Sequence, residues 1–336
     1  MRTQIVYVLI ASEQTLWGEE FWASLFSLRH FHPTVKVTVL VDSPTAEMIK
    51  GKKELYSMIT ELKVIPVPDN YSNRLRSRTI KTSVRNLIDG DYLYIDTDTI
   101  ITRPLDEIDN LPVKNIAMVP ELHGPFKNHI TYNYICNDVK RIFNVDVSDS
   151  PYWFNAGVTF VRDNTFTRDF FKKWHENWEY SAFVKKQTSD MRALICTDKS
   201  YGYIIERLPD VYNSQIAMSI EYLYDAKIVH FWHMRGLFKH DENYSPFCNH
   251  SIYQQIKKEG KISADVANQI LSCKSTFYSP SMVVGRKEMQ FLMSPLYVVL
   301  GQAYHDSKSM HWFLDKLTRC VYLYGRAKAK LFKKKQ

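Results

Sequence analysis

The sequence lacks several features that define common protein classes. No apolar run reaches the length of a membrane span. The apolar run Ile5–Ile10 is too short for the core of a signal peptide, so we expect a buried strand there. The five cysteines are odd in number and widely spaced, and no Cys-x-x-Cys occurs. A disulfide framework or zinc site is therefore disfavoured, and a reducing, cytoplasmic compartment is expected.

Excess positive charge is confined to the C-terminus. The chain has 44 basic and 36 acidic residues, and residues 326–336 contain six of the basic ones and no acid, which leaves 38 against 36 elsewhere. A nucleic-acid-binding protein would carry basic charge across a face of its fold, so we expect no nucleic-acid partner. With 336 residues, 45% of them hydrophobic, the chain can form one large domain or a domain with an appended subdomain.

Short apolar runs alternate with segments of helical periodicity in the first half of the chain. This rhythm predicts an α/β sheet with parallel crossovers. The expected strands are Ile5–Ile10, Val35–Val41, Lys63–Val67, the run that ends at Ile95, Ile116–Pro120, Val158–Arg162 and Ile228–Trp232. The expected helices are Leu16–Phe31, Thr79–Ile88 and Thr167–Tyr180. Strand signals fade after about Ser245, so we divide the chain into a domain of residues 1–244 and a helical extension of residues 245–336.

The most informative motif lies in the segment Tyr92–Ile101, where one apolar run ends in Asp96 and Asp98 and a second follows. In an extended chain these two carboxylates point to the same side, because side chains alternate with period two. Their charges repel each other, and a hard divalent cation such as Mg²⁺ or Mn²⁺ removes that repulsion. We therefore predict a metal site at the end of a strand, where open α/β sheets place their ligands.

A third metal ligand is available in the segment Ile228–His233, where His230 leaves an apolar strand and His233 is the second candidate. A lone histidine on such a strand is more often a hydrogen-bonded core residue than a ligand. An imidazole beside two carboxylates would favour Mn²⁺ somewhat over Mg²⁺.

Basic side chains precede the Asp pair on or near an expected helix. Arg78, Lys81 and Arg85 are three or four residues apart and share one face. Such a face can grip a diphosphate, because guanidinium groups supply fork-shaped donors. The alternative is a solvated helix face.

The Asp pair also fits haloacid-dehalogenase-like phosphatases, which use Asp-x-Asp after an apolar strand with the first Asp as nucleophile. Those enzymes usually carry the motif on their first strand and need a later acidic pair. Here the motif follows three other expected strands, and no Asp-Asp dipeptide occurs. This alternative is therefore less favoured.

The C-terminal segment has helical spacing of apolar residues from Met310 to Leu331, with basic residues over much of the remainder. An amphipathic helix with aromatic and basic faces suits an anionic membrane surface, which would make the protein peripheral at the inner face of the membrane. A docked helix with a solvated basic end is an equal alternative.

Four motifs together resemble glycosyltransferase family 8, which contains glycogenin and bacterial lipopolysaccharide galactosyl- and glucosyltransferases. They occur in the family's order, and the resemblance covers roughly residues 3–240. The motifs are Tyr92–Thr99, Asn155–Gly157, Leu208–Asn213 and Ile228–Trp232. The resemblance implies a GT-A fold, which is a mixed nucleotide-binding sheet flanked by helices. It also implies a UDP-sugar donor, Mn²⁺ or Mg²⁺, retention at the anomeric carbon, and an acceptor in a surface glycan, lipopolysaccharide or lipid-linked glycan.

By the same resemblance, Asp96, Asp98 and His230 are the metal ligands, and Asn155 and Asp190 lie at the donor sugar. The expected donor-binding residues are Tyr7, Ala11 and Ser12 at the uracil or ribose, Thr97 near the nucleotide, and Lys81 and Arg78 on the helix before the motif. Two departures from the family pattern stand out. Met191 replaces a usual Gln, and the Lys-Pro-Trp segment after the His is missing, which leaves Arg235 or Lys239 to meet the diphosphate. That missing segment motivates one more alternative, a nucleotide-sugar-binding protein with little catalysis.

Overall fold

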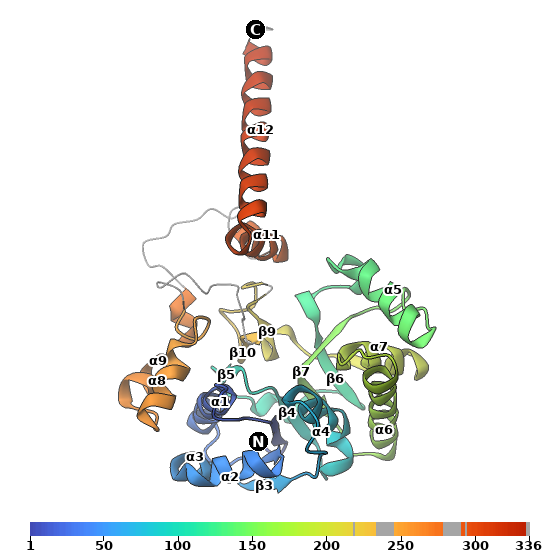
Figure 1. Ribbon diagram of the computed structural model, residues 1–336, viewed down its shortest axis with the longest axis vertical. Coiled ribbons are helices and arrows are strands. Elements are labelled where there is room, and N and C mark those ends of the chain that lie inside the picture. The colour runs from blue at the N-terminus through green and yellow to red at the C-terminus, as the bar shows by residue number, and fades with distance from the viewer. Residues whose placement is uncertain (218, 233–244, 278–289, 293, 334–336) are drawn as a thin grey trace.

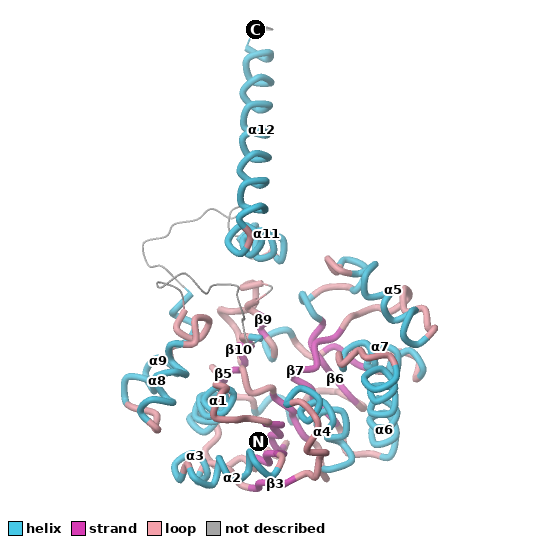
Figure 2. Tube along the Cα trace, in the orientation of Figure 1, coloured by secondary structure: helices cyan, strands magenta, loops and turns pink. Residues whose placement is uncertain are grey.

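The computed structural model describes residues 1–336 apart from 218, 233–244, 278–289, 293 and 334–336, and its central element is a sheet with helices on both faces (Figures 1 and 2). Among the described residues this sheet has seven strands, in the order β3 (Glu61–Val64), β2 (Val37–Val41), β1 (Gln4–Leu9), β4 (Tyr92–Ile95), β7 (Phe154–Val161), β6 (Ile116–Pro120) and β8 (Ile205–Arg207). β7 is antiparallel to β4 and β6, and the other neighbours are parallel. The sheet is therefore mixed, as the family resemblance predicts, and not wholly parallel as the alternation of elements suggested.

Two apolar layers sandwich the sheet. Along β1, Ile5, Tyr7 and Leu9 pack on one face, and Val6 and Val8 pack on the other, because strand side chains alternate. The first face is covered by α1 (Trp17–Phe31), α2 (Ser43–Gly51), α3 (Lys53–Ser57), α8 (Ser251–Glu259) and α9 (Ala264–Leu271). The second face is covered by α4 (Asn73–Leu87), α6 (Thr165–Glu179) and α7 (Asp190–Ser200), and α5 (Tyr132–Phe143) packs beside α7.

A smaller sheet adjoins the end of β4. Among the described residues it has three strands in the order β5 (Thr99–Ile101), β10 (Ile228–His230) and β9 (Ser214–Gln215). β5 begins three residues after Asp96, so the two sheets meet at the Asp96–Asp98 segment. This junction brings a strand from late in the chain next to the Asp pair.

The C-terminal helices divide into two groups. α8 and α9 contribute Ile252, Ile256, Val266 and Ile270 to the core that contains α1. α11 (Pro295–Asp306) and α12 (Lys308–Lys333) pack on each other, and α12 extends away from the sheet (Figure 1). The domain division at residue 245 stays a prediction, but the described part of the extension up to Cys273 shares the core of the sheet. No helix of the described residues is both long enough and apolar enough to cross a bilayer.

Helix α4 begins six residues earlier than the apolar spacing predicts, because Ser72 caps it through a hydrogen bond from the Leu75 N–H. The additional first turn contains Arg74. The apolar pattern missed this turn because its residues are mainly polar.

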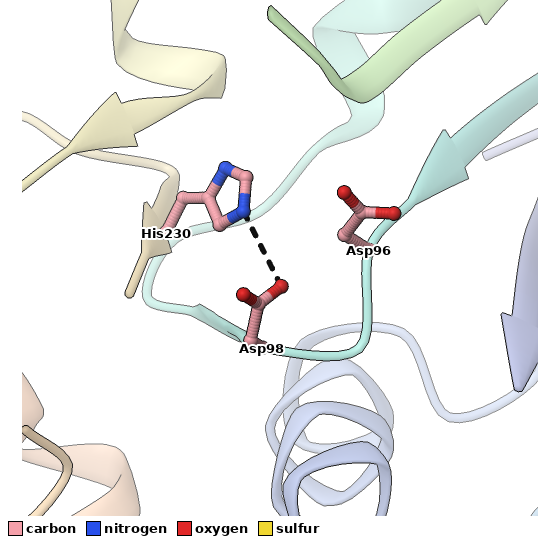
Figure 3. A group of neighbouring side chains, drawn as sticks. All are labelled: Asp96, Asp98 and His230. Carbon is pink, nitrogen blue, oxygen red and sulfur yellow. Dashed lines mark ion pairs between the residues drawn. The ribbon is translucent and has the colours of Figure 1, made fainter. Parts of the chain in front are cut away.

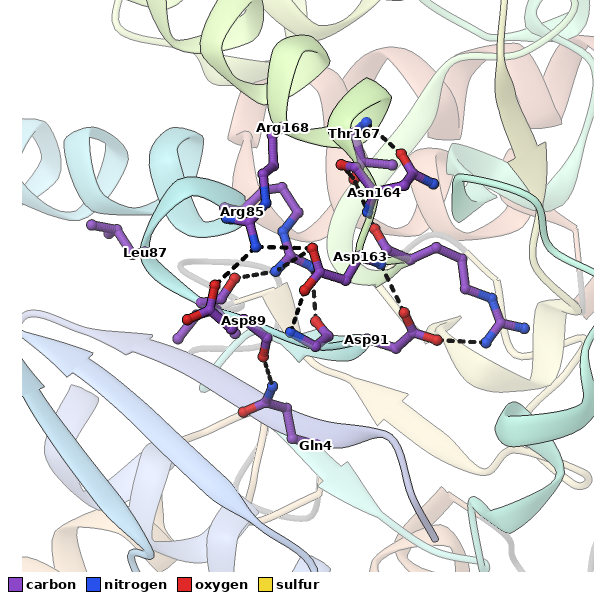
Figure 4. Close-up of polar contacts among 12 residues, drawn as sticks. Gln4, Arg85, Leu87, Asp89, Asp91, Asp163, Asn164, Thr167 and Arg168 are labelled. Atoms are coloured by element: carbon purple, nitrogen blue, oxygen red, sulfur yellow. Dashed lines mark hydrogen bonds and ion pairs between the residues drawn. The ribbon is translucent and has the colours of Figure 1, made fainter.

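Arg85 is neither a diphosphate ligand nor part of a solvated helix face, which corrects both sequence interpretations. Its side chain is fully buried. The guanidinium donates to the carbonyl oxygens of Ile88 and Gly90 and faces the Tyr92 ring. It also lies 3.5 Å from Asp163 (Figure 4). Arg85 therefore fixes the turn that joins α4 to β4.

A buried acid on α7 makes stability depend on pH. Asp198 is 3% exposed, and burial raises its pKa to about 6 although it accepts hydrogen bonds from the Ile204 and Ile205 N–H groups. Because the folded-state pKa is raised, this group's stabilising contribution is complete below the unfolded pKa of about 4 and is lost as the pH rises through 6. The loss approaches about 3 kcal/mol at neutral pH.

We therefore expect Asp198→Asn to raise the free energy of unfolding at pH 7.5 by about 1–3 kcal/mol and to change it little at pH 4. Denaturant unfolding at the two pH values measures this difference. Asp69→Asn is the control, because Asp69 is fully exposed. Its effect on the free energy of unfolding should be the same at pH 4 and at pH 7.5. An equal effect of Asp198→Asn at pH 4 and pH 7.5 would contradict the assignment.

Candidate active site

Three side chains that can ligate a metal converge where the two sheets meet. Asp96, Asp98 and His230 each offer a ligand atom, and these atoms all lie within 4.8 Å of one another (Figure 3). His230 Nε2 lies 3.3 Å from Asp98 Oδ1, and both side chains are largely buried. The Asp pair lies in a bend between β4 and β5, not in extended strand, so the bend brings the carboxylates together rather than strand alternation.

Backbone pairing places His230 in the site. In the smaller sheet, β10 is antiparallel to β5 with His230 opposite Thr99. The Phe231 N–H also donates to the Asp98 carbonyl at 2.9 Å. The sheet therefore fixes the position of the histidine relative to the Asp pair, although the two lie far apart in the sequence.

Asp96 is surrounded by donors. Lys81 Nζ lies 2.9 and 3.0 Å from the two Asp96 carboxylate oxygens, and the Tyr94 hydroxyl donates to Oδ1. Burial and the Asp96 charge raise the pKa of the Tyr94 hydroxyl well above its ordinary value, so it keeps its proton. Lys81 therefore contacts the first Asp of the motif.

Gly157 on β7 leaves a space between the ligands. A Cβ atom at this position would lie 2.3 Å from His230 Cε1 and 2.9 Å from Asp96 Oδ2. Because only a residue without a side chain leaves this space open, the three side chains can approach one ion. Two carboxylates and an imidazole are a donor set that suits Mn²⁺ and also accepts Mg²⁺. The residues present fit a divalent cation.

An open cavity of about 510 Å³ adjoins the Asp pair. Its walls come from the end of β1, the first turns of α4, the bend after β4, and two tryptophans. The lining residues are Val8, Leu9, Ile10, Trp17, Asn73, Arg74, Ser77, Arg78, Tyr94, Asp96, Thr97, Asp98, Ala217 and Trp232. This volume falls in the range of small-molecule sites.

Asp190, the expected acid, begins α7 and is buried behind Arg78. Arg78 Nε lies 3.1 Å from Asp190 Oδ1. Burial favours the neutral acid, but the charges of Arg78, Lys81 and Arg74 outweigh it and lower the pKa of Asp190 below its ordinary value. Asp190 is therefore a carboxylate at neutral pH, and it is paired with Arg78, which lines the cavity, but does not itself line it.

Asn155 lies at the start of β7 beside the metal ligands. Its Oδ1 accepts from the Gly157 N–H at 2.9 Å and from Asn213 Nδ2 at 3.0 Å. Its side-chain oxygen is thus engaged within the protein, whereas its Nδ2 makes no hydrogen bond to the described residues.

The remaining predicted donor-binding residues differ in placement. Thr97 lines the cavity. Ala11 and Ser12 follow the lining residue Ile10 in the chain but are not part of the wall. Tyr7 does not reach the cavity, because the cavity is lined only by the end of the strand from Val8 onward. Tyr7 is fully buried before that point, where it packs on Phe21 and its hydroxyl contacts Ser24. Three further candidates, His233, Arg235 and Lys239, lie outside the described residues.

Sequence reasoning missed several residues at this site. Gly157 and Asn213 lie within the motifs Asn155–Gly157 and Leu208–Asn213 that resemble the family. Those motifs are the sequence feature by which the two residues could have been found. Trp17 and Trp232 line the cavity, but nothing in the sequence separates them from core aromatics.

A scan against protein-family models finds no match, and a search of curated proteins finds no relative. The fold is similar to solved glycosyltransferase structures. Galactosyltransferase LgtC in complex with donor and acceptor sugar analogs gives a TM-score of 0.51 at 16% identity over 83% of this chain and 98% of LgtC. The apo bifunctional glycosyltransferase WbbM gives 0.51 at 12% identity over 78% of this chain and 52% of WbbM. Apo GlyE from Streptococcus pneumoniae TIGR4 gives 0.50 at 13% identity over 84% of this chain and 66% of GlyE.

This chain spans nearly all of LgtC but only about half of WbbM. At sequence identities of 12–16%, the structural similarity shows the fold alone. The chain has the GT-A fold of glycosyltransferases, with the Asp pair at the carboxyl end of β4. A haloacid-dehalogenase-like phosphatase would have a different fold, so the fold disfavours that interpretation of the Asp pair.

Proposed function

We propose that this protein is a metal-dependent glycosyltransferase that moves a hexose from a UDP-sugar to a glycan or lipid-linked acceptor. The observation that carries the proposal is the convergence of Asp96, Asp98 and His230 beside a ligand-sized cavity in a GT-A fold. Retention at the anomeric carbon and a role in lipopolysaccharide or surface-glycan synthesis rest on the resemblance to glycosyltransferase family 8.

The charges of the described site support a metal and a diphosphate together. Three carboxylates face three cationic side chains, so a divalent ion leaves the site with two positive charges. The two phosphate groups of a nucleotide-sugar diphosphate carry two negative charges and balance them. The groups counted are Asp96, Asp98 and Asp190 against Arg74, Arg78 and Lys81.

The residues of the site have different roles when the bond between the sugar and the diphosphate breaks. Asp96, Asp98 and His230 would hold the ion, which when bound acts as a Lewis acid on the departing diphosphate. Arg78, which lines the cavity, supplies a fixed positive charge beside the leaving group. The Asp190 carboxylate, charged at neutral pH, holds Arg78 in place at 3.1 Å, and it would contact the sugar only after Arg78 moves.

Ligand-linked thermal stability tests the proposal. The chain is heated with UDP, GDP or CMP, each with and without Mn²⁺, and release of UDP from UDP-sugars is then followed with a panel of acceptors. We expect UDP with Mn²⁺ to stabilise the chain most, by about 2.7 kcal/mol at a hundred times its dissociation constant. If no nucleotide shifts the transition in the presence of metal, the proposal is wrong.

A second candidate is a nucleotide-sugar-binding protein with little catalysis. The position of Asp190 favours it, because this carboxylate is paired with Arg78 and does not line the cavity. It predicts Mn²⁺-dependent UDP binding without UDP release on any acceptor. The two assays above therefore separate the candidates.

We also propose that the C-terminal helix α12 contacts an anionic membrane surface, which would place the protein at the inner face of the membrane. Large apolar side chains on this helix are more than half exposed, namely Trp312, Phe313, Val321, Leu323 and Tyr324. The sequence adds six basic residues within residues 326–336. Each basic residue near an anionic surface contributes about 1 kcal/mol.

Deleting Tyr322–Gln336 should therefore lower the bound fraction on anionic vesicles at least about fivefold, and high salt should do the same to the intact chain because it screens the charges. Vesicle sedimentation measures both effects, with neutral phosphatidylcholine vesicles as the control. Unchanged binding after the deletion would favour the docked-helix alternative.

A further inference from the structure

A chain of hydrogen bonds runs from the backbone of β7 to the ring of His230. The Gly157 N–H donates to Asn155 Oδ1 at 2.9 Å, and Asn213 Nδ2 donates to the same oxygen at 3.0 Å. Asn213 Oδ1 then lies 2.9 Å from His230 Nδ1. The bond between Asn213 and His230 is enclosed, because Asn213 is fully buried and His230 is 3% exposed. Water therefore cannot easily replace a lost partner.

The backbone fixes the direction of every bond in this chain. A backbone N–H can only donate, so the Asn155 atom that faces Gly157 must be its oxygen. That oxygen needs a donor from Asn213, which turns the Asn213 amide nitrogen toward Asn155. The Asn213 oxygen consequently faces His230, and His230 Nδ1 must donate to it. In the neutral ring the lone pair is then on Nε2, the nitrogen that faces Asp98.

We propose that Asn213 is the positioning residue that holds His230 with its proton on Nδ1 and its Nε2 lone pair toward the metal position. The inference rests on the metal role proposed above for His230. Hydrogen bonds of this kind orient metal-binding histidines, and losing them typically costs 10–100-fold in metal affinity. Without the Asn213 acceptor, the ring proton would move to Nε2 and donate to Asp98, and a metal ion would have to displace it.

The tautomer can be observed in the metal-free, full-length wild-type chain. Long-range ¹H–¹⁵N NMR of ¹⁵N-histidine-labelled protein, at a pH where the ring is neutral, distinguishes a protonated Nδ1 from a protonated Nε2. The His230 signals are assigned with His230→Gln. We expect a protonated Nδ1. A protonated Nε2 in the wild-type chain overturns the inference, whatever the metal result.

Three variants then test the consequence by Mn²⁺ affinity, measured by electron paramagnetic resonance. Asn213→Leu removes the acceptor and should weaken Mn²⁺ binding at least about tenfold. Asn213→Asp keeps an acceptor for His230 but loses the donor to Asn155, so it should weaken Mn²⁺ binding clearly less than Asn213→Leu does. Ser214→Ala is the matched control and should not change the affinity, because it removes a neighbouring buried hydroxyl that has no hydrogen-bond partner among the described residues.

The outcomes separate this inference from the proposed function. Wild-type affinity in Asn213→Leu overturns it, and so does equal weakening in Asn213→Leu and Asn213→Asp, which would point to lost packing. If the wild-type protein binds no Mn²⁺, the proposed function is wrong. The His230 tautomer then still shows whether the hydrogen bonds between Gly157 and His230 run in the inferred direction. If Asn213→Leu does not fold, the wild-type tautomer and Asn213→Asp decide it.

Discussion

Gly157→Ala should lower metal-dependent sugar transfer at least about a hundredfold while leaving the sheet folded. The added Cβ would lie 2.3 Å from His230 Cε1 and 2.9 Å from Asp96 Oδ2, well inside contact distance. These atoms belong to two proposed metal ligands, Asp96 in the bend after β4 and His230 on β10, so one methyl group pushes two of the three ligands apart. Disturbing a residue that only supports a ligand already costs 10–100-fold. Displacing the ligands themselves should cost more.

Backbone strain does not explain such a loss, because Gly157 is in a strand and its φ angle is not positive. Gly124→Ala is the matched control, since a Cβ there has its nearest neighbour at 3.6 Å. Mn²⁺ affinity and UDP release measure the effect, and circular dichroism verifies the fold. Near-wild-type Mn²⁺ affinity in Gly157→Ala would refute the proposed geometry of the metal site.

Asp98→Asn provides a reference for the same site. It removes the charge of one ligand without adding volume, and we expect transfer to be abolished while the fold survives. Near-normal turnover with UDP-sugar and Mn²⁺ in this variant would exclude the metal-dependent mechanism. Comparison with Gly157→Ala separates lost charge from lost space.

The second large effect is on stability. Arg85→Met should lower the free energy of unfolding by about 3–5 kcal/mol, because it removes a fully buried guanidinium. Two carbonyl oxygens at the α4–β4 turn lose their donor, and Asp163 loses one of its two arginine partners (Figure 4). Denaturant unfolding measures the change. Arg85→Lys should rescue it little, because one ammonium cannot reproduce a fork of donors.

Arg168→Met is the matched control for this prediction. Arg168 also binds Asp163, at 2.9 Å, but it is about one-third exposed. Exposed ion pairs contribute at most about 1 kcal/mol. If both methionine variants cost the same, burial of Arg85 is not the source of its effect. Because α4 carries Arg78 and Lys81, Arg85→Met should also weaken UDP binding in the molecules that remain folded.

Local sequence patterns were reliable where neighbouring residues decide the structure. The apolar run Ile116–Pro120 predicts β6 without error in its bounds, and the run Ile5–Ile10 predicts β1 within one residue at each end. Local sequence patterns were insufficient to predict which individual side chains reach the cavity. Tyr7 was expected at the nucleotide, but it is fully buried in the core beside α1, and only the residues from Val8 to Ile10 of this segment line the cavity.

Arg85 is a second example of the same difficulty. Its spacing from Arg78 and Lys81 correctly places all three on one helix. The spacing contains no information about which end of that helix meets the cavity and which meets the turn before β4. Arg78 lines the cavity, whereas Arg85, two turns later, lies buried against Asp163 and the turn carbonyls.

The sequence by itself determined the strand that ends in Asp96 and Asp98, because an apolar run followed by two acids is a short-range signal. It also supplied the motifs that contain Asn155, Gly157, Asn213 and His230. Only the tertiary structure decided that these residues meet. His230 reaches the Asp pair because β10 pairs with β5, and Gly157 reaches both because β7 lies beside β4. Such contacts depend on the order of strands in the two sheets, which no local pattern of residues encodes.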